Sequence, residues 1–249
     1  MPENDRTNAM PFHDGRFAAT HWSVVRAAGR PETTQYQQAM RALCETYWLP
    51  IYVYLRRCGH RQDAAEDYTQ GFFTCLLEKE GLRLADARRG KFRSFLLTAL
   101  KHFLANERDK NHALKRGGGR RILSLDWEEA EGRYAVQPAA GVSPEKVFER
   151  SWALAVLERA MSGLEEELVR RGRGELFEQL KAYMTAGEET VPYQDVARTL
   201  GMTENAVKVA VHRLRRRYRE LLREEIAHTV TEESEIDEEI RDLFAALAR

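Results

Sequence analysis

The sequence has few of the features that mark exported, membrane-embedded or strand-rich proteins. Its first residues lack the basic and apolar segments of a signal peptide, and no apolar run approaches the roughly 20 residues that span a bilayer. Only 7 of the 249 residues are proline, whereas 31% are charged, and this balance favours long, solvent-exposed helices. We therefore expect an all-α protein that is neither exported nor inserted in a membrane.

Patterns for metal binding and catalysis are also missing. Cys44, Cys58 and Cys75 are too widely spaced for a CxxC metal pair and lie among helix-like apolar positions, which predicts buried free thiols and a reducing cytoplasm. The seven histidines form no HExxH-like spacing, and Glu66 and Asp67 are helix neighbours that do not face each other as a catalytic pair. We expect no enzyme activity, metal, cofactor or small-molecule substrate.

Charge is balanced over the whole chain but segregated along it. There are 39 basic and 39 acidic residues, yet residues 88–121 hold eleven Lys or Arg and two acids, a net charge of +9. Residues 208–223 hold seven against one, a net charge of +6, and residues 224–249 hold nine acids and two arginines, a net charge of −7. Two basic blocks are typical of nucleic-acid binding, and the acidic tail hides them in the total.

The N-terminal half contains three amphipathic stretches. Apolar spacings of three and four predict a helix or helix pair over residues 34–57, with Pro50 marking a break or kink, and a second helix from about 63 to 79. The third stretch, residues 91–110, interleaves aromatic rings with cations, and we assign its rings to the core. The predicted DNA contacts of this stretch are Lys91, Arg93, Lys101, His102, Asn106 and Arg108.

Glycine and proline then interrupt the helical pattern. No period survives from residue 116 to residue 143, which predicts a flexible linker, and Ser143-Pro144-Glu145 restarts a helix with a serine cap. We therefore expect two helical domains joined by this linker. The predicted organisation is an N-terminal segment 1–33, a first domain 34–115, a linker 116–143, a second domain 144–228 and an acidic tail 229–249.

The second domain ends in a predicted helix-turn-helix. Tyr193–Leu200 reads as a short helix, Gly201-Met202-Thr203 as a tight turn, and Glu204 begins a long basic helix. In DNA-binding proteins of this design the start of the second helix faces base edges, and later residues reach phosphates. The predicted base-facing residues are Glu204, Asn205 and Lys208, and the predicted phosphate contacts are His212, Arg213, Arg215 and Arg216. The alternative is a helical hairpin with a merely solvated basic face.

The acidic tail carries an apolar stripe at helical spacing, formed by Ile236, Ile240, Leu243, Phe244 and Leu247. One interpretation is a short regulatory helix that covers a basic face of the protein or binds a partner. The other is a frayed, solvated terminus.

Three motifs, taken in order, resemble the extracytoplasmic-function sigma factors of RNA polymerase. The segment Ala65-Glu-Asp-Tyr-Thr-Gln-Gly-Phe-Phe is similar to the family's AEDLVQEVF helix, which docks on the largest polymerase subunit. Residues 92–106 resemble its FRAWLFRIARNRLID helix, which melts and reads the minus-ten element, and residues 193–217 resemble its minus-thirty-five-reading helix-turn-helix. The sequence departs from the family pattern at Gly71 (usually Glu), at Phe103 (frequently Arg) and at Val209-Ala210 (commonly Ser-Arg).

The resemblance implies a cytoplasmic, non-catalytic factor that binds core RNA polymerase through Asp67 and Gln70 and directs promoter recognition, DNA melting and initiation. It implies that Arg93, Lys101, His102 and Asn106 face promoter DNA near the melted segment, and that Glu204, Asn205, Lys208 and Arg213 lie along the upstream element. An anti-sigma protein, a regulatory kinase or the tail is the expected means of control. The alternative function is a helix-turn-helix regulator that binds an operator without core polymerase and uses its N-terminal half for dimerisation or ligand sensing.

Overall fold

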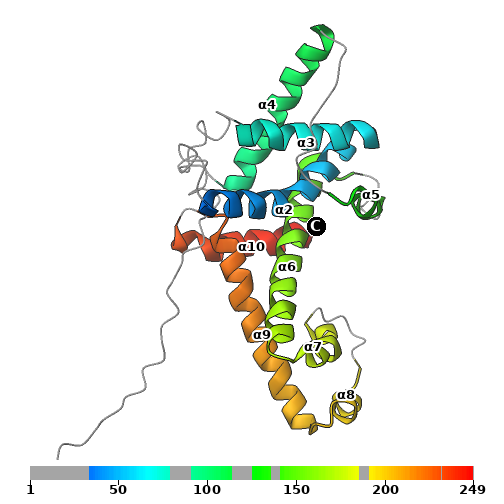
Figure 1. The fold of residues 1–249 in the computed structure, drawn as a ribbon, viewed down its shortest axis with the longest axis vertical. Coiled ribbons are helices and arrows are strands. Elements are labelled where there is room, and N and C mark those ends of the chain that lie inside the picture. The colour runs from blue at the N-terminus through cyan, green and yellow to red at the C-terminus, as the bar shows by residue number, and fades with distance from the viewer. Residues whose placement is uncertain are drawn as a thin grey trace, which may run out of the picture.

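The protein is all-α in the computed structural model, which describes residues 34–78, 91–113, 125–135, 141–184, 191–230 and 232–248 (Figure 1). Every regular element in these ranges is an α-helix or a short 3-10 helix, which confirms the predicted fold class. The elements are α2 (Thr34–Arg57), α3 (Gln62–Glu78), α4 (Phe92–Ala113), α5 (Trp127–Ala135), α6 (Pro144–Arg170), α7 (Gly174–Leu180), η2 (Lys181–Tyr183), α8 (Tyr193–Thr199), α9 (Glu204–Ala227), η3 (Glu233–Glu235) and α10 (Ile236–Leu247).

The larger hydrophobic core surrounds α2. Residues 34–57 form one helix with Pro50 inside it, which is the single-helix alternative of the prediction. Tyr47, Ile51 and Leu55 have no exposed surface and pack with buried residues of α3, α4, α6 and α10, among them Trp152. Each such side chain contributes about 1.5–3 kcal/mol by leaving water, so this core holds the upper part of the molecule together.

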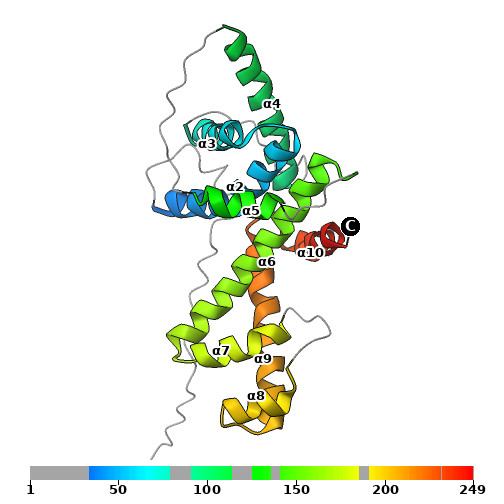
Figure 2. The same ribbon diagram turned by 90° about the vertical axis from the view of Figure 1, so that its right-hand side faces the viewer.

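A smaller core joins α7, α8 and the first half of α9 to the second half of α6. Leu164, Leu168, Phe177 and Leu180 pack there with residues of α8 and α9. Both long helices belong to both cores, because residues 147–160 of α6 and Leu222 of α9 pack in the larger one. Figures 1 and 2 show α6 and α9 side by side, running from the upper part to the lower part. Residues 147–160 of the predicted second domain are thus built into the core of the first.

The prediction of a helix-free linker is wrong at α5, which lies inside the range 116–143. Ala130 is fully buried, Trp127 lies 5.5 Å from the ring of Tyr52, and Glu131 accepts a hydrogen bond of 2.6 Å from the Tyr52 hydroxyl. The segment is short and its glycines hide the period in the sequence, but contacts with α2 stabilise the helix. The predicted segment 1–33 and residues 114–124 and 136–140 lie outside the described residues.

The acidic tail is an integral helix, and the frayed-terminus alternative is wrong. Leu243 of α10 is fully buried and Ile236 is 6% exposed, and both pack in the larger core against α6 and α9. The predicted apolar stripe is therefore the buried side of α10, except that Phe244 is 53% exposed. The acidic residues of the tail are held in place by this packing.

The cysteines only partly match the expectation of buried thiols. Cys44 is buried, and burial raises the pKa of its thiol to about 12, whereas Cys58 and Cys75 are exposed free thiols. Cys58 directly follows the last residue of α2, and Cys75 lies on the outer side of α3, so neither shares the buried stripe of its neighbours. The prediction of burial is wrong for these two.

Candidate nucleic-acid interface

A tight turn sets the angle between α8 and α9. Gly201 adopts a φ of +62°, a conformation that side chains with a Cβ rarely take, and Met202 N donates to the Ala197 carbonyl at 2.9 Å. The Thr203 hydroxyl then accepts a hydrogen bond from Ala206 N at 3.2 Å, which caps the first turn of α9. The sequence positions chosen for the turn and the cap therefore have these roles.

A shared core fixes which side of α9 faces outward. Val196 and Ala197 of α8 pack with Val207, Val211 and Leu214 of α9, and all five are at most 6% exposed. Leu200 and Met202 are half-buried around this core, as the sequence pattern predicts. At about 100° per residue, Asn205, Val209, His212 and Arg216 lie on the side of α9 opposite this buried stripe, and all four are exposed.

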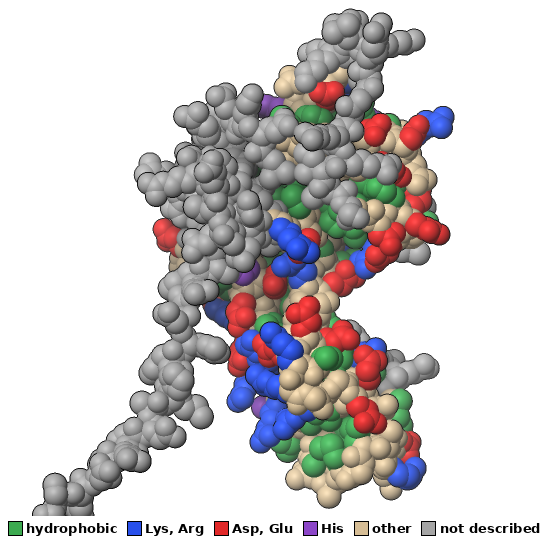
Figure 3. Space-filling model, in the orientation of Figure 1, with side chains coloured by type: hydrophobic (Ala, Val, Ile, Leu, Met, Phe, Trp, Pro, Cys, Tyr) green, Lys and Arg blue, Asp and Glu red, His purple; other side chains and the backbone are tan. Residues whose placement is uncertain are grey.

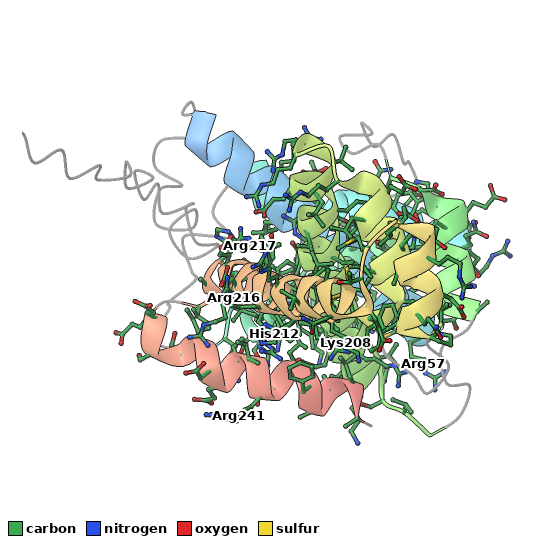
Figure 4. The ribbon with its side chains drawn as sticks, turned by 90° about the horizontal axis from the view of Figure 1, so that it is seen from below. Arg57, Lys208, His212, Arg216, Arg217 and Arg241 are labelled. Atoms are coloured by element: carbon green, nitrogen blue, oxygen red, sulfur yellow. The ribbon has the colours of Figure 1, made fainter. Side chains whose placement is uncertain are left out.

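Basic side chains gather along this outward side. In Figure 3, Lys and Arg side chains form a blue strip over the lower part of the molecule, where α9 runs. In Figure 4, Lys208 and His212 lie on one side of α9 and Arg217 on the other. We call the exposed set on this helix the α9 basic face; it consists of Asn205, Lys208, Val209, His212, Arg213, Arg216 and Arg219.

Local ion pairs occupy some of the predicted base-facing residues. The Lys208 ammonium lies 2.6 Å from a Glu204 carboxylate oxygen and 5.7 Å from the ring centre of Tyr193. The hydrogen bond to Glu204 raises the pKa of Lys208, so this lysine stays charged. The side-chain amide of Asn205 is exposed and makes no hydrogen bond to another described residue, so both its donor and its acceptor are available.

The arginines of α9 divide into anchored and available ones. Arg215 donates to the Tyr183 carbonyl at 2.8 and 3.2 Å, and Arg217 pairs with Glu167 at 2.5 Å. Two guanidinium nitrogens of Arg215, Nε and Nη2, are therefore engaged with a backbone carbonyl, although the residue is exposed. Arg213 and Arg219 have no carboxylate partner in the described part of the chain. The sequence analysis missed Arg219, although its exposed position at the helical period could have identified it.

The structure overturns the assignment of Arg93 as an exposed DNA contact. Arg93 is 5% exposed and lies 4.3 Å above the ring of Trp152. Its guanidinium donates to Glu149 at 2.6 Å, to Asp242 at 3.2 Å and to buried Glu239. Three carboxylates from α6 and α10 thus enclose a cation that the sequence places at the start of a basic helix.

Lys91 shares this acidic surrounding. Its ammonium lies 3.1 Å from Glu239 and 3.8 Å from Glu238, and it also pairs with Asp242. Burial and the nearby Arg93 lower the pKa of Lys91. The prediction that Lys91 faces DNA is corrected together with that of Arg93, because its ammonium is paired with carboxylates of α10. The sequence could not show this pairing, since α10 lies at the far end of the chain and only the tertiary fold brings it to α4.

The remaining predicted residues of α4 are on the surface. His102, Asn106 and Arg108 are exposed, whereas the ammonium of Lys101 bonds to Glu145 at 2.9 Å. That bond lowers the pKa of Glu145. The available residues on α4 therefore lie in its second half, beyond the contact with α6.

On α3, the two residues that the resemblance assigns to polymerase binding, Asp67 and Gln70, are exposed and half-exposed. The departures at Gly71 and Phe103 turn out to be partners. A Cβ at Gly71 would lie 3.2 Å from Cζ of Phe103, whose ring also packs edge-on with Phe72 at 5.8 Å. A side chain at position 71 would therefore approach this ring more closely than an ordinary van der Waals contact, and the ring would have to shift by a few tenths of an ångström to accept it.

Comparison with protein-family models, with curated proteins and with solved structures found no match for this chain. Among the described residues, no group of three or more His, Cys, Asp or Glu side chains is arranged to hold a metal ion. Likewise, none of the helices in those ranges is both long and apolar enough to cross a membrane.

Proposed function

We propose that this chain binds duplex DNA through the α9 basic face and acts with core RNA polymerase as a sigma-type promoter-recognition factor. One observation carries the proposal: the capped turn before α9 projects a helix whose outward side combines Asn205 with Arg213 and Arg219, two cations that pair with no carboxylate of the described residues. A helix presented in this way fits the major groove, with amide and guanidinium groups for bases and phosphates.

The polymerase part of the proposal is supported by the exposed position of Asp67 and the half-exposed position of Gln70 on α3 and by the motif order in the sequence. The cytoplasm is the proposed location, since core polymerase is there and exposed free thiols such as Cys58 persist in a reducing compartment. No catalytic step is assigned to the chain.

A second function has its own support. Because Arg93 is buried and Lys91 is paired with α10, the first half of α4 offers little free positive charge, and α9 remains as the main basic surface of the described residues. That distribution favours a helix-turn-helix regulator that binds an operator without polymerase.

Reconstituted transcription separates the two functions. Adding the full chain to bacterial core RNA polymerase should start transcripts at defined genomic promoters. The triple variant Arg213→Ala/Arg216→Ala/Arg219→Ala should lose this activity. Its DNA affinity should also depend less on salt, with a log–log slope lower by about one unit for each phosphate that the protein no longer neutralises.

The matched control removes three other exposed arginines, Arg170, Arg171 and Arg173, at the end of α6. It loses the same charge and should keep activity and salt slope. Sequence-specific DNA binding without any polymerase-dependent initiation would favour the regulator instead. Loss of binding in the control as well would contradict the α9 basic face.

A further inference from the structure

Val209 is an apolar side chain at the centre of an otherwise polar surface. It is 42% exposed, and the helical period places it on the side of α9 opposite buried Val207 and Val211. Its neighbours one turn away are Asn205 before it and His212 after it, both exposed. Within the described residues, packing in a core therefore does not account for a valine here.

The residue type is also unfavourable for the helix itself. A β-branched side chain loses rotamer freedom in a helix, so an exposed valine is slightly worse than the alanine that follows it. Single exposed apolar residues are common on protein surfaces and need no function. The position of Val209 is different, because it is the middle of the face that the proposed function puts into the major groove.

The major groove exposes one apolar group to such a residue, the C5-methyl of thymine. The side chains around Val209 are suited to a site that contains an A·T pair. Asn205 can bond to both N6 and N7 of adenine, whereas Glu204 and Lys208 are engaged with each other at 2.6 Å. A short apolar side chain next to an available amide thus fits a thymine methyl beside an adenine edge.

We propose that Val209 is a specificity-determining residue that contacts a thymine methyl in the DNA bound by α9. The inference rests on the proposed function and adds to it a residue and the base group that it recognises. Replacing the valine should change which base is preferred at one position and leave phosphate binding in place.

The test removes single methyl groups from the DNA. Full-length protein first enriches duplexes from a randomised pool, with and without core RNA polymerase, and each thymine of the enriched duplex is then replaced by deoxyuridine. At one position wild-type protein should bind the deoxyuridine duplex about fourfold more weakly, the effect of losing one buried methyl group. Val209→Ser should bind the two duplexes equally, and Val209→Thr, which keeps one methyl, should retain part of the difference.

Val169→Ser is the matched control, since Val169 is 57% exposed and belongs to α6, not to the α9 basic face. It should discriminate between thymine and deoxyuridine as the wild type does. Enrichment followed by equal binding of all deoxyuridine duplexes, or discrimination that survives in Val209→Ser, would overturn the role of Val209 and leave the proposed function standing. No enrichment under either condition would overturn both.

Discussion

Replacing Arg93 with alanine is expected to destabilise the protein strongly, because the change removes the guanidinium partner of the buried Glu239 carboxylate and leaves only Lys91 beside it. The side chains of Arg93 and Glu239 are only 6% and 3% exposed. Removing one partner of a buried ion pair costs about 3–5 kcal/mol, since the remaining charge keeps its desolvation penalty. The Arg93 guanidinium also lies 4.3 Å from the centre of the Trp152 ring, and a desolvated cation–π contact of this kind contributes up to about 2 kcal/mol. Part of this contribution is already contained in the roughly 3–5 kcal/mol for the ion pair.

A loss of this size should lower the midpoint of thermal unfolding by about 10 °C for a chain of this length. Urea unfolding followed by far-ultraviolet circular dichroism measures the loss in free energy of unfolding directly. Lys101→Ala is the matched control, because Lys101 and Glu145 are 48% and 45% exposed and such surface pairs contribute about 0–1 kcal/mol.

The double variant Arg93→Met/Glu239→Leu tests the cause. If the cost of Arg93→Ala comes from an uncompensated carboxylate, replacing both charges with apolar side chains should recover most of the stability. If the free energy of unfolding of Arg93→Ala is within about 1 kcal/mol of the wild-type value but the variant loses DNA affinity, the reasoning is refuted. Arg93 then has the DNA-facing role that its place in the sequence suggests.

Three further outcomes are expected. Gly71→Glu should crowd the Phe103 ring, and this crowding should offset the gain of about 1 kcal/mol in helix propensity. In a thermal-unfolding cycle the same substitution should be more favourable in the Phe103→Ala background, whereas equal effects in both backgrounds would exclude the crowding. Deleting residues 231–249 should lower the urea midpoint, because α10 covers the larger core, and should change affinity for DNA or polymerase; unchanged affinities in filter binding would remove a regulatory role of the tail. The hydrogen bond from Arg217 lowers the pKa of Glu167, so this carboxylate stabilises the fold above its unfolded pKa of about 4.3, and the contribution disappears as pH falls through the folded value. Glu167→Gln should therefore be less stable than wild type at pH 7, and the difference should narrow in urea titrations as the pH falls below about 4.3; a constant difference would contradict the pairing.

The local parts of the proposed interface could be predicted from sequence because their causes are local. The turn at Gly201 and the cap at Thr203 depend on neighbouring residues and on backbone preferences that each residue type carries with it. The same holds for the buried stripe of α9 and for the helix start at Ser143, whose hydroxyl accepts from Lys146 N. Helical periodicity and capping depend only on residues within one or two helical turns of each other, so both can be recognised in the sequence.

The linker and the contacts of Arg93 could not be predicted in that way. Trp127–Ala135 is helical because Ala130 and its neighbours pack on α2, more than 70 residues earlier in the chain. A basic residue before an amphipathic helix is normally a surface residue, and nothing near position 93 indicates that Glu239, 146 residues later, will enclose it.

The sequence alone thus determined that the chain is all-helical, that its charge is divided into two basic blocks and an acidic tail, and that α9 follows a capped turn, since composition and helical period depend on short-range physics. Only the tertiary structure decided which cations remain free. The α10 helix buries its apolar side in the larger core and thereby places its carboxylates on Lys91 and Arg93, whereas Arg213 and Arg219 stay exposed because no acidic side chain of the described residues pairs with them. The sequence determines which residues carry a charge, but long-range packing decides which of those charges remain unpaired.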